Sequence, residues 1–208
     1  MRTLIFDFDG TIADNFFIAK DIFRTLVRMT GNRHPSDEAE VEVLRSLTAR
    51  QVIARLKVHW WQLPYVLYFA RKQMHKRQDE MRPIKGLPEV LAELHKRGHK
   101  LFIVSSNSQK NVQRFLDTHD LTQYFDGVYA GLGLFNKAGT LQKIVKQRRV
   151  AAKDCAYVGD EARDVDTARK AHMPCISVTW GYNNLKGLNR VHPETVINTP
   201  RELLKLVQ

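Results

Sequence analysis

Residues 4–14 read LIFDFDGTIAD, and this stretch decides the fold. The apolar run between Arg2 and Phe6 predicts a short buried strand. Asp7 and Asp9 stand two residues apart where this strand gives way to a glycine-containing turn, so both carboxylates can face one site. Taken alone, such a pair of acids can also cap a turn or bind an ion. The stretch therefore predicts a strand that delivers two carboxylates to one place.

Strand-like and helix-like segments alternate regularly only after about residue 84. The predicted elements are, in order, a helix over 86–98, a strand over 100–105, a helix capped by Ser108, a strand over 128–130, a helix carrying Leu141 and Ile144, a strand over 154–158, a helix over 161–171, a strand over 175–178 and a last helix opened by a capping box at Thr199. Such alternation implies right-handed crossovers and a parallel sheet covered on both faces. We expect an α/β, Rossmann-like core whose ligand site lies at the carboxyl ends of the strands.

Residues 15–83 interrupt this alternation. They are rich in helix formers, contain no good strand run and are divided by Pro35 and Pro64. We therefore expect an all-α cap over residues 15–83, inserted into a core made of residues 1–14 and 84–208. The cap holds 13 Lys+Arg against 7 Asp+Glu, a net charge of +6, while the core holds 20 against 15, a net charge of +5. The aromatic residues between 58 and 69 are interpreted as helix packing, with a surface for a flat group as the alternative.

The pair of acids acquires a specific meaning from the residues around it. A carboxylate that attacks phosphorus needs a cation nearby to offset its repulsion from the phosphate, and a second acid to protonate the leaving oxygen. DFDGT at residues 7–11 resembles the D-x-D-G-T signature of phosphatases of the haloacid dehalogenase (HAD) superfamily. The resemblance implies that Asp7 becomes phosphorylated and that Asp9 acts first as acid and then as base. Three further family elements follow in the expected order, so the resemblance spans nearly the whole chain.

The second element is LFIVSSN at residues 101–107, which looks like the family's apolar strand ending in Ser or Thr. In the family this hydroxyl and the following backbone N–H hold the transferring phosphoryl group. The resemblance favours Ser106, with Asn107 beside it in substrate binding, and leaves Ser105 as the alternative. A serine at a strand end can also simply cap the next helix.

The third element is a lysine at the start of a helix, and Lys137 in the stretch FNKA, residues 135–138, fits this position. The resemblance implies that Lys137 neutralises the charge of the carboxylate and the phosphoryl group. Lys143 is the weaker alternative. A lysine in a basic chain is usually a solvated surface charge, so this assignment rests on position within the family pattern.

The fourth element is AYVGDEARD at residues 156–164, which matches the family's strand followed by G-D-x-x-x-D. Asp160 and Asp164 are one helical turn apart and therefore share a face. The resemblance implies that Asp160 ligates Mg²⁺ directly, while Asp164 orients Asp160, the waters or Lys137. With Asp7 and Asp9 they form the predicted metal site, because oxygen ligands of this kind suit Mg²⁺. Two acids near a helix N-terminus also interact favourably with the helix dipole, which is the structural alternative.

Asp9 narrows the expected chemistry. Family members that act on carbon–halogen or carbon–phosphorus bonds lack an acid two residues after the nucleophile, so Asp9 points to phosphate esters. The cap position and the stretch VTWGYN at residues 178–183 resemble the phosphoglycolate phosphatase-like branch. The expected function is Mg²⁺-dependent hydrolysis of a small phosphorylated metabolite through an aspartyl-phosphate. The alternatives are a nucleotide or polynucleotide-end phosphatase, a phosphosugar mutase and a non-catalytic binding protein on the same fold.

Composition limits the remaining classes. The 208 residues carry 33 Lys+Arg against 22 Asp+Glu, so the formal net charge of +11 favours an anionic partner, with a nucleic acid as the alternative to a small phosphorylated substrate. The longest apolar runs fall far short of the roughly 20 residues that span a bilayer, and no membrane partner is expected. Two cysteines beside apolar segments indicate buried, reduced thiols, and the expected location is the cytoplasm. The sequence does not indicate an oligomeric state.

Overall fold

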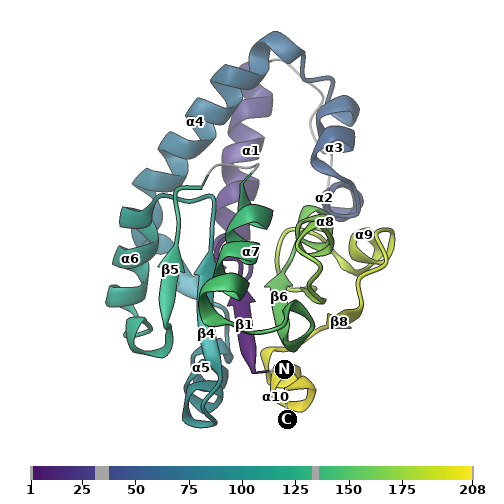
Figure 1. Ribbon diagram of the computed structural model, residues 1–208. Coiled ribbons are helices and arrows are strands. Elements are labelled where there is room, and N and C mark those ends of the chain that lie inside the picture. The colour runs from purple at the N-terminus through teal and green to yellow at the C-terminus, as the bar shows by residue number, and fades with distance from the viewer. Residues whose placement is uncertain (1, 31–37, 133–135, 208) are drawn as a thin grey trace.

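A six-stranded parallel sheet forms the centre of the computed structural model, which describes residues 2–30, 38–132 and 136–207 (Figure 1). The strands lie in the order β5–β4–β1–β6–β7–β8, and each neighbouring pair is parallel. Their bounds are β1 (Thr3–Phe6), β4 (Lys100–Val104), β5 (Gly127–Tyr129), β6 (Cys155–Gly159), β7 (Cys175–Val178) and β8 (Thr195–Ile197). At the end of β1, Phe6 pairs with Ile103 of β4 and with Val158 of β6. The carboxyl ends of these three strands therefore meet at one edge.

Helices cover both faces of the sheet, as the fold prediction requires. They are α5 (Leu87–Lys96), α6 (Gln109–Thr118), α7 (Lys137–Arg148), α8 (Ala162–Lys170), α9 (Leu185–Asn189) and α10 (Leu203–Leu206). Because side chains alternate along a strand, Leu4 and Phe6 pack with α5 and α6 on one face, whereas Ile5 packs with α7 and α8 on the other. A strand buried on both faces must be apolar throughout, which is why the run before Asp7 holds no polar side chain between Leu4 and Phe6.

Several sequence predictions for the core are confirmed. Ser108 caps α6, since its side chain accepts a hydrogen bond from the backbone N–H of Asn111. Gly86 and Gly98 flank α5 with positive φ, and the capping box at Thr199 is present. The prediction missed β8 because this edge strand is only three residues long and two of them are half-buried, so its apolar signal is weak.

In the described part of the cap, four α-helices lie between β2 (Ala13–Asp14) and β3 (Arg82–Pro83). They are α1 (Phe16–Thr30), α2 (Glu38–Arg45), α3 (Ala49–Arg55) and α4 (Leu63–Lys76). In Figure 1, α1 and α4 run side by side and project from the sheet edge, while α2 and α3 lie apart from them, above α8 and α9. Three-residue 3₁₀ turns accompany these and the core helices: η1 (Trp60–Gln62), η2 (Gln78–Glu80), η3 (Thr122–Tyr124), η4 (Ala152–Asp154) and η5 (Pro200–Glu202).

The two strands at the cap junction correct one expectation. β2 and β3 pair antiparallel, with Ala13 opposite Pro83, so the segment expected to hold no strand contains β3. Two residues give no periodicity to detect, and the pairing arises because the chain enters and leaves the cap at the same place. Pro64 lies in the first turn of α4, whereas Pro35 lies outside the described residues. The division into a core and a cap at residues 14/15 and 83/84 stays a prediction.

Two further expectations concern the thiols and the membrane. Cys155 and Cys175 are both free and buried, and burial raises the pKa of both thiols. This agrees with the interpretation of both as inert thiols. Among the described helices, none combines the length and the apolar character needed to cross a bilayer.

Candidate active site

Asp7 is the first residue after β1, and it is almost completely buried. Its backbone N–H donates to the Val158 carbonyl at 2.8 Å, which continues the β1–β6 ladder by one residue. Its Oδ1 accepts from the Phe8 N–H at 2.7 Å. The chain then turns sharply at Gly10, where φ is +77°. β1 pairs with β4 on one side and with β6 on the other. This pairing fixes the strand, and the strand in turn places Asp7 at the sheet edge.

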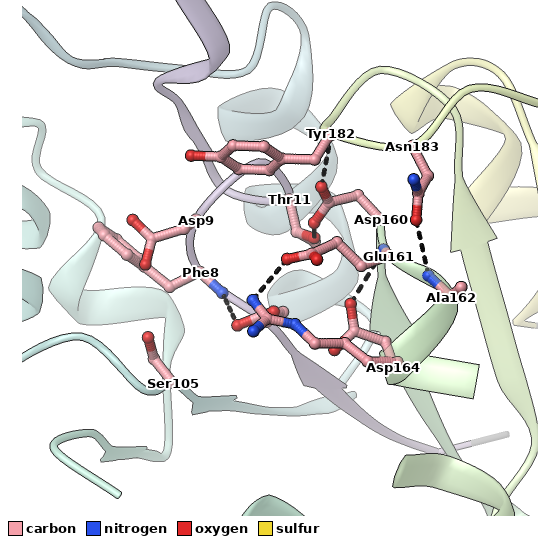
Figure 2. Close-up of polar contacts among 12 residues, drawn as sticks. Phe8, Asp9, Thr11, Ser105, Asp160, Glu161, Ala162, Asp164, Tyr182 and Asn183 are labelled. Carbon is pink, nitrogen blue, oxygen red and sulfur yellow. Dashed lines mark hydrogen bonds and ion pairs between the residues drawn. The ribbon is translucent and has the colours of Figure 1, made fainter. Parts of the chain in front are cut away.

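Asp9 belongs to the same turn, but its carboxylate is held by different partners. Asn15 donates to its Oδ1 at 2.7 Å, and Asn107 donates to Oδ1 at 3.1 Å and to Oδ2 at 3.2 Å. Figure 2 shows Asp9 on the side of the turn away from Asp160 and Asp164. Burial raises the pKa of Asp9, and the two amides pull it back without cancelling that rise.

Lys137 begins α7, and its side chain reaches Asp7. Its Nζ lies 2.6 Å from Asp7 Oδ2, 3.2 Å from the Tyr157 hydroxyl and 3.5 Å from Asp164 Oδ1. Lys143, the alternative from the sequence, lies exposed further along the same helix. Of the four residues that define the predicted lysine stretch, Phe135 lies outside the described residues. The structure therefore brings Lys137 into contact with the first aspartate.

Asp160 and Asp164 follow β6, and both are fully buried. Asp160 accepts from the Thr11 hydroxyl and from the Tyr182 backbone N–H, both at 2.7 Å. Asp164 accepts from the Glu161 N–H at 3.0 Å, within the capping box that opens α8. These contacts are drawn in Figure 2. Each carboxylate is therefore held by at least one backbone N–H, and Asp160 also by the Thr11 hydroxyl.

The carboxylates of Asp7, Asp160 and Asp164 form one group, with one oxygen of each within 4.8 Å of the others. Asp9, the fourth acid expected at the metal site, does not join this group through its carboxylate. Burial, opposed by Lys137 and assisted by Asp164, raises the pKa of Asp7 to about 7. Burial, Glu161 and Asp164 hold the pKa of Asp160 well above its usual range.

Lys137 stays charged in this environment. Burial lowers the pKa of its ammonium, but Asp7 and Asp164 outweigh burial, and the net direction is upward. Of the three buried carboxylates, Asp7 and Asp164 contact the Lys137 ammonium directly, and Asp160 lies within the same group. Such an excess of buried negative charge is costly unless a cation offsets it. Oxygen-only donors of this kind fit Mg²⁺ better than they fit softer metals.

Glycines close the space around these acids. A Cβ on Gly10 or on Gly181 would run into the Asp160 carboxylate, and a Cβ on Gly159 would run into Asp164. Gly10 also needs its positive φ, which other residues rarely adopt. The chain therefore wraps the acids so closely that no side chain can be tolerated at these positions.

The two serines at the end of β4 differ in their surroundings. Ser105 is completely buried, and its hydroxyl accepts from the Asn107 N–H at 3.0 Å. Its own N–H donates to the Tyr129 carbonyl and continues the β4–β5 ladder. Ser106 is only half-buried. The Asn107 side chain donates a hydrogen bond to Asp9, so the end of β4 faces the acids.

Three residues of the site had no role assigned from the sequence. Thr11 is part of the first motif, and its hydroxyl holds Asp160. Asn15 orients Asp9, and the Tyr182 hydroxyl donates to Asn15 at 3.0 Å. Thr11 and Tyr182 lie within stretches that the resemblance singled out, but nothing local in the sequence marks Asn15.

Comparisons with known proteins identify the family of this chain. The family model described as haloacid dehalogenase-like hydrolase matches residues 4–178. The chain belongs to this family. Among the curated proteins, the phosphoglycolate phosphatase of Synechococcus elongatus is 32% identical over 207 residues, covering 100% of this chain and 97% of the relative. The phosphoglycolate phosphatase of Aquifex aeolicus is 24% identical over 212 residues, with coverage of 100% and 97%.

A solved structure agrees with this family assignment at the level of fold. A haloacid dehalogenase-like family hydrolase from Streptococcus pneumoniae superposes with a TM-score of 0.81 at 19% identity, over 100% of this chain and 99% of that one. The resemblance drawn from the motifs is therefore confirmed, as is the α/β core with a helical cap. This haloacid dehalogenase-like hydrolase is a phosphatase that acts on phosphoric monoesters.

Proposed function

We propose that the protein is a Mg²⁺-dependent phosphatase that hydrolyses a small phosphorylated metabolite through an aspartyl-phosphate on Asp7. The observation that carries the proposal is the contact of 2.6 Å between Asp7 Oδ2 and Lys137 Nζ beside the carboxylates of Asp160 and Asp164. A nucleophilic carboxylate repels a phosphate unless positive charge offsets both, and this arrangement supplies a fixed cation on one side and cation ligands on the other.

Asp7, Asp160 and Asp164 are the carboxylates that would hold Mg²⁺. When bound there, the ion would supply the charge that stabilises the phosphoryl group during transfer. The hydrogen bonds from Thr11 and Tyr182 keep Asp160 in place whether or not an ion is present. Asp164 also contacts Lys137 and so orients the ammonium towards Asp7.

Asp7 attacks phosphorus with one carboxylate oxygen, and the bond between phosphorus and the leaving oxygen breaks. Asp9 gives its proton to that leaving oxygen, so the alcohol departs neutral. Burial raises the pKa of Asp9, which supports a protonated acid at the start of the reaction. In the second half, Asp9 takes a proton from water, and the water oxygen attacks phosphorus and frees Asp7.

Ser105, Asn107 and Lys137 are the groups that we propose to hold the phosphoryl oxygens. The burial of Ser105 at the end of β4 favours its hydroxyl over that of Ser106, which was the first choice from the sequence. In this arrangement Ser106 is the residue that links Ser105 to Asn107, and its own hydroxyl does not hold the phosphoryl group. Asn107 also keeps the Asp9 carboxylate turned towards the reacting phosphate.

The substrate is proposed as a small molecule because the relatives named phosphoglycolate phosphatase match along the whole chain. We propose that residues 15–83 act as a cap over the core and exclude water during transfer. The complete set of acids, lysine and serine argues against a non-catalytic binding protein. Burying this group of acids costs stability, and a binding scaffold does not need it.

Release of nitrophenol from para-nitrophenyl phosphate tests the proposal. We expect wild-type protein to be active with Mg²⁺ and inactive with EDTA, and Asp7→Asn to lose at least about a thousandfold in kcat because the nucleophile is absent. Asp117→Asn, at the far end of α6, is the matched control and should keep wild-type activity. Activity in Asp7→Asn, or equal activity with and without Mg²⁺, would refute the proposed mechanism.

A further inference from the structure

The cap helices and the core line a partly open cavity of about 600 Å³. It lies between the α1–α4 pair and the α2–α3 pair, and its lining comes from all four cap helices. This lining is largely aliphatic and aromatic, and it includes the side chains of Phe23, Val41, Ile53 and Val66. The volume is within the range of small-molecule sites, which are roughly 300–1,000 Å³.

Hydrogen bonds to the core hold the two sides of this cavity apart. The Asn183 side chain donates to the Arg45 carbonyl at 2.7 Å, and Arg190 donates to the Ser46 carbonyl at 3.0 Å. Arg45 in turn donates to the Gly181 carbonyl at 2.8 Å. The corner between α2 and α3 is thus docked on the core, while Arg45 also stacks on the Phe16 ring of α1. The cavity is therefore built by the fold, because closing it would break this network.

Of the five cations in the lining, four have carboxylate partners, and the fifth, Arg50, lies exposed on α3. Lys20 and Arg24 both pair with Glu38. Arg163 pairs with Glu161, and Arg45 pairs with Glu42 besides its contacts with the core. The surface that remains available to a ligand is therefore mainly apolar. A sugar or a nucleobase placed there would lose its hydrogen bonds to water without replacement, whereas an apolar group would gain by leaving water.

Tyr182 and the segment from Glu161 to Arg163 line the cavity on its core side, and this segment follows Asp160 directly in the chain. The Tyr182 backbone N–H holds Asp160, and its hydroxyl contacts Asn15, which holds Asp9. In Figure 2 the Tyr182 ring extends from above Asp160 towards the side of Asp9. The Tyr182 ring thus stands between the acids and the cavity, and a group attached to the leaving oxygen would have to pass this ring to enter the cavity.

We propose that the cavity receives the alcohol part of the substrate, and that this part is an alkyl or aryl group rather than a sugar, a nucleoside or a two-carbon acid. The inference rests on the proposed function, because it takes the acids as the place where phosphate is cleaved. It names the substrate class as phosphate monoesters of small apolar alcohols.

Binding of alkylphosphonates tests the cavity independently of turnover, because the carbon–phosphorus bond resists hydrolysis. Titration calorimetry in Mg²⁺ would compare methyl-, butyl- and hexylphosphonate. Each methylene that enters the cavity should lower Kd by about fourfold, with a heat-capacity change that becomes more negative along the series. A Kd that does not change with chain length would overturn the inference.

Ile53→Asn places a polar group on the cavity wall, and Ala54→Asn places the same group on the exposed side of α3. We expect Ile53→Asn to remove most of the dependence on chain length, and Ala54→Asn to keep it. Ala19→Phe, which fills the cavity with apolar volume from α1, gives the same test if Ile53→Asn fails to fold. Equal behaviour of the folded cavity variants and Ala54→Asn would contradict the proposal.

Hydrolysis of the matching alkyl phosphates separates this inference from the proposed function. If hexylphosphonate binds but no ester is cleaved, the proposed function fails and the apolar site stands. If para-nitrophenyl phosphate is cleaved but Kd and kcat/KM ignore chain length, the proposed function stands and the apolar site fails. Absence of both binding and hydrolysis would overturn both.

Discussion

Lys137 Nζ and Asp7 Oδ2 lie 2.6 Å apart although 130 residues separate them in the sequence. The parallel sheet makes this contact, because Asp7 follows the central strand β1 and the helix that Lys137 opens packs on the same edge. Both side chains are about 95% buried or more. The pair is therefore shielded from water, and its charges act on a bound phosphate more strongly than surface charges would.

Replacing Lys137 tests this pair. Lys137→Gln removes the ammonium, and we expect kcat to fall roughly 10²- to 10³-fold, as when a single stabilising donor is lost from other active sites. Lys143→Gln removes the same charge from an exposed position on the same helix and should stay within about twofold of wild type. Steady-state kinetics on para-nitrophenyl phosphate measures both. Similar losses in the two variants would show that general charge, not this contact, matters.

Asp9 should matter most for substrates with a poor leaving group. Asp9→Asn cannot donate a proton, so we expect kcat to fall roughly 10²- to 10⁴-fold on an alkyl phosphate. The loss should be smaller on para-nitrophenyl phosphate, whose leaving group departs without a proton. Asp14→Asn, at an exposed acid in β2, is the matched control. An equal loss on both substrates would argue against Asp9 as the acid.

Removal of the ion should be visible in stability. In the proposed site, bound Mg²⁺ would offset the repulsion among Asp7, Asp160 and Asp164, so it should stabilise the wild type by about 2.7 kcal/mol at roughly 100 times its Kd. For a chain of this length that corresponds to a rise in Tm of roughly 5–10 °C. In Asp160→Asn we expect little or no Mg²⁺-dependent rise. Thermal unfolding with and without EDTA gives the result, and a full rise in the variant would exclude Asp160 as a ligand.

The glycine beside Asp160 gives a structural test. A Cβ at Gly181 would collide with the Asp160 carboxylate, so we expect Gly181→Ala to cost about 1–3 kcal/mol and to weaken the response to Mg²⁺. Gly139→Ala lies in α7, where the added Cβ meets only the end of the Asn136 side chain at 3.1 Å. This control should be neutral or stabilise by up to about 1 kcal/mol. Chemical denaturation compares the two, and a neutral Gly181→Ala would contradict the packing described.

The local sequence pattern was enough to predict many of the strands and helices of the core. The apolar run before Asp7 predicts β1 because a strand buried on both faces must be apolar, and Ser108 predicts the start of α6 because its hydroxyl meets a helix N-terminus. Family resemblance supplied the positions of Lys137, Asp160 and Asp164, which the fold then brings to Asp7.

Other features depend on contacts between distant segments. β2 pairs with β3 only because the chain crosses twice between the cap and the sheet, and two residues carry no periodic signal. The burial that separates Ser105 from Ser106 comes from neighbouring strands and helices, not from the string of two serines. The cavity in the cap depends equally on distant contacts, since Asn183 and Arg190 of the core hold α2 and α3 in place.

The central claim is that Asp7 itself becomes phosphorylated. Wild-type protein mixed with Mg²⁺ and para-nitrophenyl phosphate would be quenched in acid at millisecond times, and the peptide containing Asp7 would be analysed by mass spectrometry. We expect one added phosphoryl group on Asp7, which hydroxylamine removes and which Asp7→Asn lacks. Rapid turnover by wild type with no phosphoryl group on Asp7 at any quench time, or with the group on another residue, would contradict the account.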